Sequence, residues 1–219
     1  SAFGLHACAA LETGTVAFPY TAYKCGYAIR QVSPAKPATT FHGAAAGSAT
    51  TPKNLHLTIP GNAATSVAFS WATDKDTMQS EVRFGESADH LDRVAHGFSF
   101  VSSSRRQHEL HLCGLKPSTT YYYDAGGAAG RSTVHKFTTA PDGPSDVTVL
   151  YVGDTRTNPG TLGAMAAKAL AQGPTMMMLS GDAVADGGSQ ANWDALFGAA
   201  PELCADLPVI VEIGNHGAI

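Results

Sequence analysis

The sequence predicts an all-β sandwich followed by an α/β segment with a parallel sheet. Residues 54–141 consist of short alternating segments separated by turn residues, which is typical of a β-sandwich. Beyond the linker at 141–144, continuous apolar runs alternate with helical stretches in the order β-α-β-α-β. A chain of 219 residues can bury two small cores. We therefore expect a leader at 1–53, a sandwich at 54–141 and an α/β segment at 145–219.

The leader is the least regular part of the sequence. It mixes short apolar stretches with prolines and the small-residue run Gly43–Thr51, a pattern that favours an extended arm followed by a linker. Such an arm could add a strand to the sheet of a neighbouring subunit, and the alternative is a leader that folds back on its own domain. The first residue is Ser, which indicates a processed or shortened chain.

The cysteines point to the cellular compartment. Of the four, Cys8 and Cys25 lie in the leader, where a disulfide would compensate for a poor core. This usage favours an oxidising compartment, so we expect a secreted, periplasmic or cell-surface protein. The pairing stays open, and four buried thiols are the alternative. No cysteine or histidine pair has the spacing of a structural zinc site.

The charge pattern and the length of the apolar runs exclude a nucleic-acid partner and a membrane span. Charged residues make up 15% of the chain, the formal net charge is -4, and Arg105-Arg106 is the one tight basic pair, so no nucleic-acid partner is expected. No apolar run approaches the roughly 18 residues that a bilayer span requires, so no membrane span is expected either.

Alternating residues define the strands of the sandwich. Leu55–Ile59 and Val67–Trp71 alternate apolar and polar positions, and Pro117-Ser118 turns the chain before a strand that starts near Tyr121. This predicts a tyrosine corner in which the Tyr121 hydroxyl donates to a backbone group. Six histidines of this part lack ligand spacing and are expected to be ordinary strand or surface residues: His56, His90, His96, His108, His111 and His135.

Three stretches of this part resemble a known family. Ser70–Thr73, Val82–Gly85 and Leu115–Tyr123 resemble the fibronectin-III-like N-terminal domain of purple acid phosphatases and related bacterial metallophosphoesterases. The resemblance implies a fibronectin-III-like sandwich placed before a catalytic domain.

The α/β segment has three predicted strands and two predicted helices. Val147–Val152, Thr175–Leu179 and Leu207–Ile213 are apolar strands. Thr161–Gln172 is a helix that Gly173 stops, and Ser189 can cap a second helix. Right-handed crossovers then imply a parallel sheet.

Each of the three strands ends in a polar signature. Gly-Asp follows the first two strands, giving Asp154 and Asp182, and Gly-Asn-His follows the third, giving Asn215 and His216. The carboxyl ends of parallel strands form the ligand crevice of α/β folds, so these residues are expected to converge. Hard oxygen donors of this kind suit divalent or trivalent metal ions, and we predict that Asp154, Asp182 and Asn215 are metal ligands.

The ordered combination of these signatures resembles the calcineurin-like metallophosphoesterase superfamily. The resemblance implies two divalent or trivalent metal ions (Fe, Mn or Zn) and a phosphate ester substrate. It implies that Asp154 binds the first metal, Asp182 bridges both, and Asn215 binds the second. His216 would be catalytic by protonating or orienting the leaving-group oxygen.

The sequence departs from the family pattern at two positions of the site. Arg156 stands where many members carry a histidine ligand; it stays protonated and cannot bind a metal, but it can bind a phosphate oxygen, so it is the second predicted catalytic residue. Ala185 stands where purple acid phosphatases place a tyrosine, so their charge-transfer colour is not expected.

The family completes its site with later histidine motifs, and this sequence has none before Ile219. The expectation is therefore a fragment, inactive by itself with doubtful metal occupancy, of a metal-dependent phosphoesterase. The alternative is a non-catalytic extracellular structural or fibre-forming subunit that reuses the fold. It would assemble through the leader arm or an exposed sheet edge.

Overall fold

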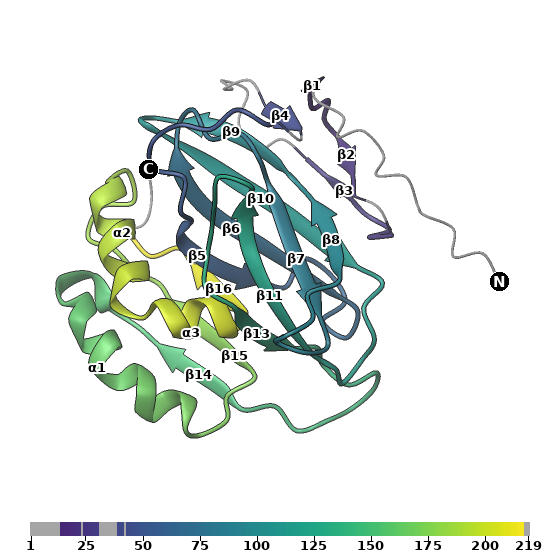
Figure 1. The fold of residues 1–219 in the computed structure, drawn as a ribbon. Helices are drawn as coiled ribbons and strands as arrows, with labels where there is room; N and C mark the ends of the chain where they lie inside the picture. The colour runs from purple at the N-terminus through teal and green to yellow at the C-terminus, as the bar shows by residue number, and fades with distance from the viewer. Residues whose placement is uncertain (1–13, 23, 31–38, 42, 217–219) are drawn as a thin grey trace.

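The computed structural model describes residues 14–22, 24–30, 39–41 and 43–216. Two antiparallel sheets packed face to face make up most of the molecule, and a parallel sheet with its helices lies against one side of them (Figure 1). The protein is thus rich in β-structure with few helices.

The first sheet of the sandwich has the strand order β1-β4-β9-β10-β6-β5 and is antiparallel throughout. Its strands are β1 (Gly14–Thr15), β4 (Thr39–Phe41), β5 (Lys53–Thr58), β6 (Ser66–Asp74), β9 (Phe98–Ser102) and β10 (Arg105–Cys113). The second sheet has the order β12-β11-β7-β8, with β13 also paired to β11. Its strands are β7 (Glu81–Gly85), β8 (Arg93–His96), β11 (Thr120–Gly127), β12 (Gly130–Arg131) and β13 (His135–Thr138).

The core of the sandwich follows from the period of two residues along each strand. In β10, half-buried and buried positions alternate over the whole strand, so one face packs inward. Phe69 and Trp71 enter the core from the first sheet, and Val82 and Tyr123 enter it from the second, all at most 1% exposed.

The predicted tyrosine corner is present, with the opposite direction of the hydrogen bond. The backbone N–H of Lys116 donates to the Tyr121 hydroxyl over 3.0 Å. The prediction that this hydroxyl donates was wrong, because the turn presents an N–H, which can only donate. The contact fixes the start of β11 against the turn that precedes it.

The described part of the leader folds back on its own domain. β1 pairs with β4, and β4 pairs with β9 of the sandwich, while β2 (Tyr20–Thr21) and β3 (Ala28–Ile29) form a separate two-stranded sheet. A disulfide joins Cys25 to Cys113 at the end of β10.

The structure shows whether three of the four cysteines are paired or free. The partner of Cys25, which the sequence left open, is Cys113, 88 residues away. Cys204 is a buried free thiol whose pKa burial raises to about 12. Cys8 lies outside the described residues.

Three strands beyond the sandwich pair in parallel in the order β14-β15-β16. The elements of this segment are β14 (Val149–Val152), η1 (Thr155–Thr157), α1 (Pro159–Leu170), β15 (Met176–Ser180), α2 (Gln190–Ala199), α3 (Pro201–Asp206) and β16 (Val209–Glu212). Helix α3 was not predicted. Pro201 occupies its first turn, where the missing N–H costs nothing, and Glu202 adds a favourable charge there.

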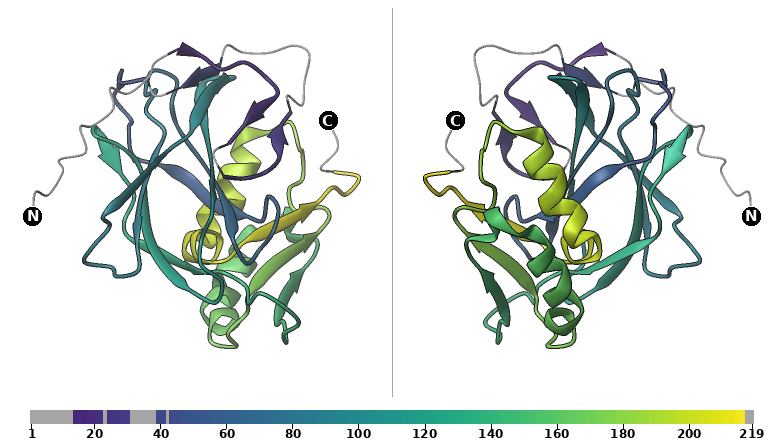
Figure 2. Two further views of the ribbon diagram at one scale, coloured as in Figure 1. Left: turned by 90° about the vertical axis from the view of Figure 1, so that its right-hand side faces the viewer. Right: turned by 90° about the vertical axis from the view of Figure 1, so that its left-hand side faces the viewer.

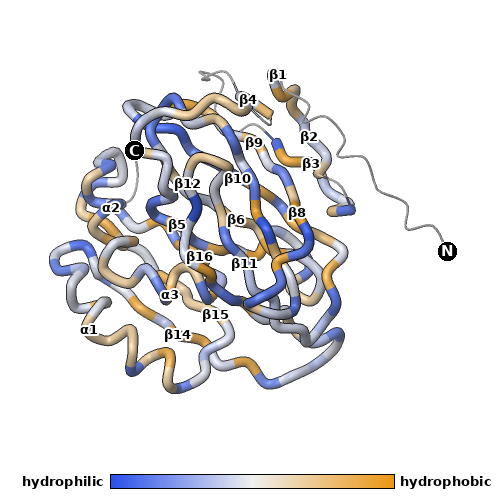
Figure 3. Tube along the Cα trace, viewed as in Figure 1, coloured by the Kyte–Doolittle hydropathy of each residue, from blue (hydrophilic) through white to orange (hydrophobic). Residues whose placement is uncertain are grey.

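The described residues cover the parallel sheet on one face only. Leu162, Leu196 and Leu203 of the three helices pack with Met177 and related residues of the strands in one core. Tyr151 and Ile210, which point to the other face, are exposed. The orange stretch at β14 in Figure 3 marks the hydrophobic character of this strand.

Helices α2 and α3 connect the parallel sheet to the sandwich, as the side views show (Figure 2). The two terminal nitrogens of Arg105 donate to the two carboxylate oxygens of Asp194 on α2, each over 2.7 Å. The buried Tyr123 hydroxyl donates to the Ala205 carbonyl over 2.7 Å. Among the described residues, no helix is both long and apolar enough to cross a membrane.

Candidate metal centre

The carboxyl ends of the three parallel strands lie in contact with one another. A Cβ atom added to Gly153 would overlap the Ser180 hydroxyl at the end of β15. A Cβ atom added to Gly214, beyond β16, would overlap Asp182. At Gly214 the overlap includes the Asp182 backbone nitrogen, so glycine is required there, whereas at Gly153 the Ser180 side chain could rotate away.

The two aspartates share an uncommon backbone conformation. Asp154 and Asp182 have φ angles of 53° and 47°, in the left-handed region that Asp and Asn tolerate better than most residues. Each therefore turns the chain sharply within two residues of its strand end. The equivalent turns place both side chains at the same edge of the sheet.

Arg156 lies between the two carboxylates. Its Nε is 3.3 Å from Asp154 Oδ1, and its Nη1 is 3.2 Å from Asp182 Oδ2. Its backbone N–H also donates to the Asp182 carbonyl over 3.2 Å. The Asp154 side chain is 75% exposed and that of Asp182 is 14% exposed, so the cluster opens to solvent on the Asp154 side.

His216 is attached to the same cluster. Its backbone N–H donates to Asp182 Oδ1 over 3.0 Å, and its Nδ1 is 3.0 Å from the Ala185 carbonyl oxygen. Because a carbonyl only accepts, Nδ1 carries the proton in this contact, which leaves Nε2 for other partners. The residue is exposed.

Asn215 shares the loop of His216. The neighbours on either side of Asn215, Gly214 and His216, both contact Asp182, so the backbone of Asn215 is fixed beside the cluster. The residue is exposed, and its side chain has no hydrogen-bond partner within the described residues. The structure therefore brings Asp154, Asp182, Arg156 and His216 into direct contact and places Asn215 on the same loop.

Sequence reasoning missed Thr155. This buried residue donates its hydroxyl to the Ala183 carbonyl over 2.9 Å and thereby ties η1 to the loop that follows β15. The bond fixes the residues on either side of Thr155, Asp154 and Arg156, relative to Asp182. A single threonine in a loop carries no sequence signal of such a role, since loop hydroxyls are common.

The donor set partly fits a metal ion. Carboxylate and amide oxygens suit hard cations, and Asp154, Asp182 and Asn215 would supply them. Within the described part of the chain, however, no group of three or more His, Cys, Asp or Glu side chains is arranged to hold a metal. The arrangement can thus offer one cation two carboxylates, provided that Arg156 moves, while a second ion would need further ligands.

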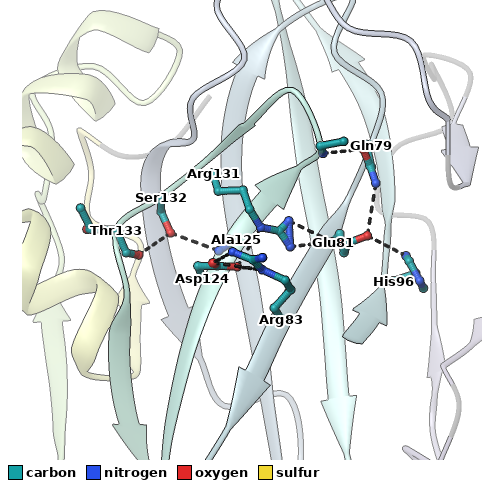
Figure 4. Close-up of polar contacts among 10 residues, drawn as sticks. Gln79, Glu81, Arg83, His96, Asp124, Ala125, Arg131, Ser132 and Thr133 are labelled. Atoms are coloured by element: carbon teal, nitrogen blue, oxygen red, sulfur yellow. Dashed lines mark hydrogen bonds and ion pairs between the residues drawn. The ribbon is translucent and has the colours of Figure 1, made fainter. Parts of the chain in front are cut away.

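A second cluster of charged residues lies on the sandwich (Figure 4). Arg83 and Arg131 both donate to the carboxylate of Asp124, and Arg131 also donates to Glu81. The contact with Asp124 raises the pKa of Arg83. Glu81 in turn accepts from Gln79. Every charged group of this cluster has an opposite charge beside it, so it is a structural network.

Comparison with known proteins agrees with the fold. Residues 52–139 match the family model described as the purple acid phosphatase N-terminal domain. No curated protein sequence matches the chain significantly.

Two solved structures resemble most of the chain. One is the purple acid phosphatase PPD1 from yellow lupin (Lupinus luteus) seeds, with a TM-score of 0.63, 18% identity, and coverage of 76% of this chain and 36% of that chain. The other is PhoD, with a TM-score of 0.55, 15% identity, and coverage of 78% and 40%. At these identities the likeness shows the fold, and this chain spans less than half the length of either structure.

Proposed function

We propose that this chain, a purple acid phosphatase-like protein with the N-terminal domain of that family, supplies part of a metal-dependent phosphoesterase site. The observation that carries the proposal is the convergence of three strand ends on Asp182. Arg156 and His216 both contact its carboxylate, and Arg156 also contacts Asp154. Converging polar residues at the carboxyl ends of parallel strands are where α/β folds bind ligands.

The proposed roles follow from the position of each group. Asp154, Asp182 and Asn215 would hold metal ions (Fe, Mn or Zn), with Asp182 as the bridging ligand. When bound, such ions provide an activated water and a clamp for phosphate oxygens. His216 Nε2, left open by the bond of Nδ1 to Ala185, would protonate or orient the leaving-group oxygen of a phosphate ester. Arg156 would bind a phosphate oxygen.

We also propose that the residues of this chain form an incomplete site. The two structures that it resembles are more than twice as long as the part it covers, and the described residues hold no group of three or more His, Cys, Asp or Glu side chains arranged for a metal ion. Three oxygen ligands without imidazoles would hold a single metal ion loosely, so the chain by itself would be a poor catalyst. The disulfide and the family relationship support a secreted or cell-surface location.

The test replaces the proposed bridging ligand. Asp182→Asn keeps the shape and tolerates the φ of 47°, but it removes the charge that a metal ion needs. We expect Mn²⁺ binding to this chain, measured by titration calorimetry, to weaken at least about tenfold, which corresponds to about 1.4 kcal/mol. In the native polypeptide that contains the chain, metal-dependent hydrolysis of an aryl phosphate should be lost.

Asp186→Asn is the matched control. Asp186 lies four residues away, and its carboxylate accepts only from the backbone N–H of Gly188 among the described residues, a contact that an amide oxygen can replace. Its metal binding and hydrolysis should stay unchanged. Full activity of the Asp182→Asn variant with metal still bound would rule out the assignment of the bridging ligand.

A second candidate function rests on the uncovered face of the parallel sheet. Val149, Tyr151 and Ile210 are exposed there, and β14 has one free edge among the described strands. Exposed apolar faces and free edges favour association, so a structural subunit could assemble through this surface. The described leader strands already pair within their own sheet, and we propose the uncovered face and the edge of β14 as the surface for assembly.

Analytical ultracentrifugation separates the two candidates. A structural subunit should form oligomers that Tyr151→Glu dissociates, without any effect of metal ions. A monomer over the full concentration range would exclude this candidate and leave the phosphoesterase site.

A further inference from the structure

The carboxylates of the candidate metal centre already have a cation between them. The guanidinium of Arg156 reaches Asp154 with Nε and Asp182 with Nη1, at 3.3 Å and 3.2 Å. Its backbone is fixed from two sides, because its own N–H is bonded to the Asp182 carbonyl and the preceding Thr155 is bonded to Ala183. The guanidinium thus occupies the space between the carboxylates as a positioned group of the fold.

Counted over the described residues, the charges in this cluster do not balance. One guanidinium faces two carboxylates, which leaves one negative charge over, whereas two arginines face Asp124 and Glu81 in the sandwich. A divalent ion in place of the guanidinium would remove that excess, while a monovalent ion would only repeat the charge already present. Replacing the guanidinium by a metal ion is therefore favourable only for ions with a charge of at least +2.

A metal ion and the guanidinium would need the same atoms. Asp182 Oδ1 accepts from the His216 N–H, so Oδ2, which contacts Arg156, is the oxygen most open to a metal. Two cations at hydrogen-bond distance from one carboxylate repel each other strongly. Arg156 is about one-third exposed and has a long flexible stem, so its head can leave toward solvent without unfolding the loop.

We propose that Arg156 is a built-in counter-cation of Asp154 and Asp182 that competes with metal ions for these ligands and so selects multivalent over monovalent cations. The identity of the competing ion rests on the metal site proposed above. The charge balance between Arg156 and the two aspartates rests on the structure of this chain alone.

The first experiment measures metal affinity without any enzyme assay. Mn²⁺ is titrated by calorimetry into the wild-type chain, Arg156→Gln and Arg156→Lys. Arg156→Gln should bind Mn²⁺ at least about tenfold more tightly, because no cation has to be displaced. It should also lose discrimination against Na⁺, measured as a stronger weakening of Mn²⁺ binding by added NaCl. Arg156→Lys keeps the charge and should stay close to the wild type.

Arg93→Gln is the matched control. Arg93 also lies beside two carboxylates, with Glu86 at 3.6 Å and Asp92 at 3.8 Å, but in the sandwich. Its loss should leave Mn²⁺ binding unchanged. If Arg156→Gln and Arg93→Gln both bind Mn²⁺ like the wild type, competition by Arg156 is excluded. If none of the proteins binds Mn²⁺, the proposed metal site is wrong.

A second experiment tests the counter-cation in the absence of metal. Urea unfolding of Arg156→Gln, Asp182→Asn and the double variant is measured in the presence of a chelator. The single changes should not add, because Asp182→Asn removes the negative charge that Arg156 balances. Strict additivity would show that the guanidinium does not balance this carboxylate and would overturn the proposal even if metal binds.

Discussion

The sandwich and the ends of the parallel strands each contain an arginine that bridges two carboxylates, and the two clusters differ in burial and charge. In the sandwich, the Asp124 side chain is 4% exposed and receives Arg83 and Arg131 together. At the strand ends, Asp154 is 75% exposed, and in the described part of the chain a single cation, Arg156, faces both aspartates. In the sandwich, the positive and negative charges are equal in number and partly buried, which fits a structural role. At the strand ends, the exposed carboxylates outnumber the cation beside them and could bind a further cation.

The largest expected difference between the clusters is in stability. Arg131→Gln should lower the free energy of unfolding by about 3 kcal/mol, because it leaves the buried Asp124 and Glu81 short of a cation. Arg156→Gln should change it by only about 0.5 kcal/mol, since its partners reach solvent. Urea unfolding monitored by tryptophan fluorescence measures both. Equal losses would mean that the strand-end cluster is a structural network as well.

The sandwich should also respond to pH through His108. This histidine is buried between Thr73 and Ser80, whose hydroxyls contact its two ring nitrogens, and burial lowers its pKa to about 3. Below pH 6.5 the His108 side chain binds a proton in the unfolded chain but stays neutral in the folded chain. The free energy of unfolding should therefore fall by about 1.4 kcal/mol per pH unit as the pH drops from 6.5 toward 3, and be unaffected above 6.5.

His108→Gln should remove this contribution to the slope, because glutamine can contact both hydroxyls without titrating. The control is His90→Gln, since His90 is exposed in a turn. Denaturation midpoints at pH 7, 6, 5 and 4 measure the effect. Identical slopes for the wild type and His108→Gln would show that this histidine does not limit acid stability.

A further, modest effect is expected at the junction between the two regions. Asp194 on α2 accepts from Arg105 and Asn54 of the sandwich, and the bond to Arg105 lowers the pKa of Asp194. Asp194→Ala should cost about 1 kcal/mol, because the pair is partly exposed. Since the pKa of Asp194 is lowered in the fold, the contribution of this pair is present at neutral pH and is lost in acid.

Hydrogen exchange locates this effect. Amides of α2 should exchange faster in Asp194→Ala, while those of β6 in the sandwich core stay protected. Asp142→Ala, at an exposed carboxylate in the linker, is the control. Unchanged exchange in α2 would mean that the apolar contacts of this helix hold the junction without the ion pair.

Periodicity made much of the fold predictable. Alternation located β6 and β10, and the continuous apolar runs located β14 and β15. The patterns gave the burial less well, because β6 is buried at nearly all positions and β14 exposes Val149 and Tyr151. Helix α3 escaped prediction because its six residues are too few to show a helical period. The pairing of Cys25 with Cys113 escaped as well, since contacts over 88 residues depend on the folded topology.

The sequence was enough to expect the proposed site residues near one another, but not to expect the contacts between them. The position of Asp154 and Asp182 after apolar strands was enough to expect them at one edge of a sheet. The bridging position of Arg156 and the bond of Thr155 to Ala183 depend on side-chain directions within a tight turn, which sequence spacing does not specify. The roles of Asp154, Asp182, Asn215, Arg156 and His216 stay predictions that the variants above test.

The link between Cys25 and Cys113 has a consequence for protease digestion. It closes a covalent ring that includes every peptide bond between these residues. A protease that cuts once within this ring yields two pieces that stay attached, so the digest migrates as one band on a gel without reductant. Dithiothreitol would then separate the pieces, and their masses would report which loop of the ring the protease reached.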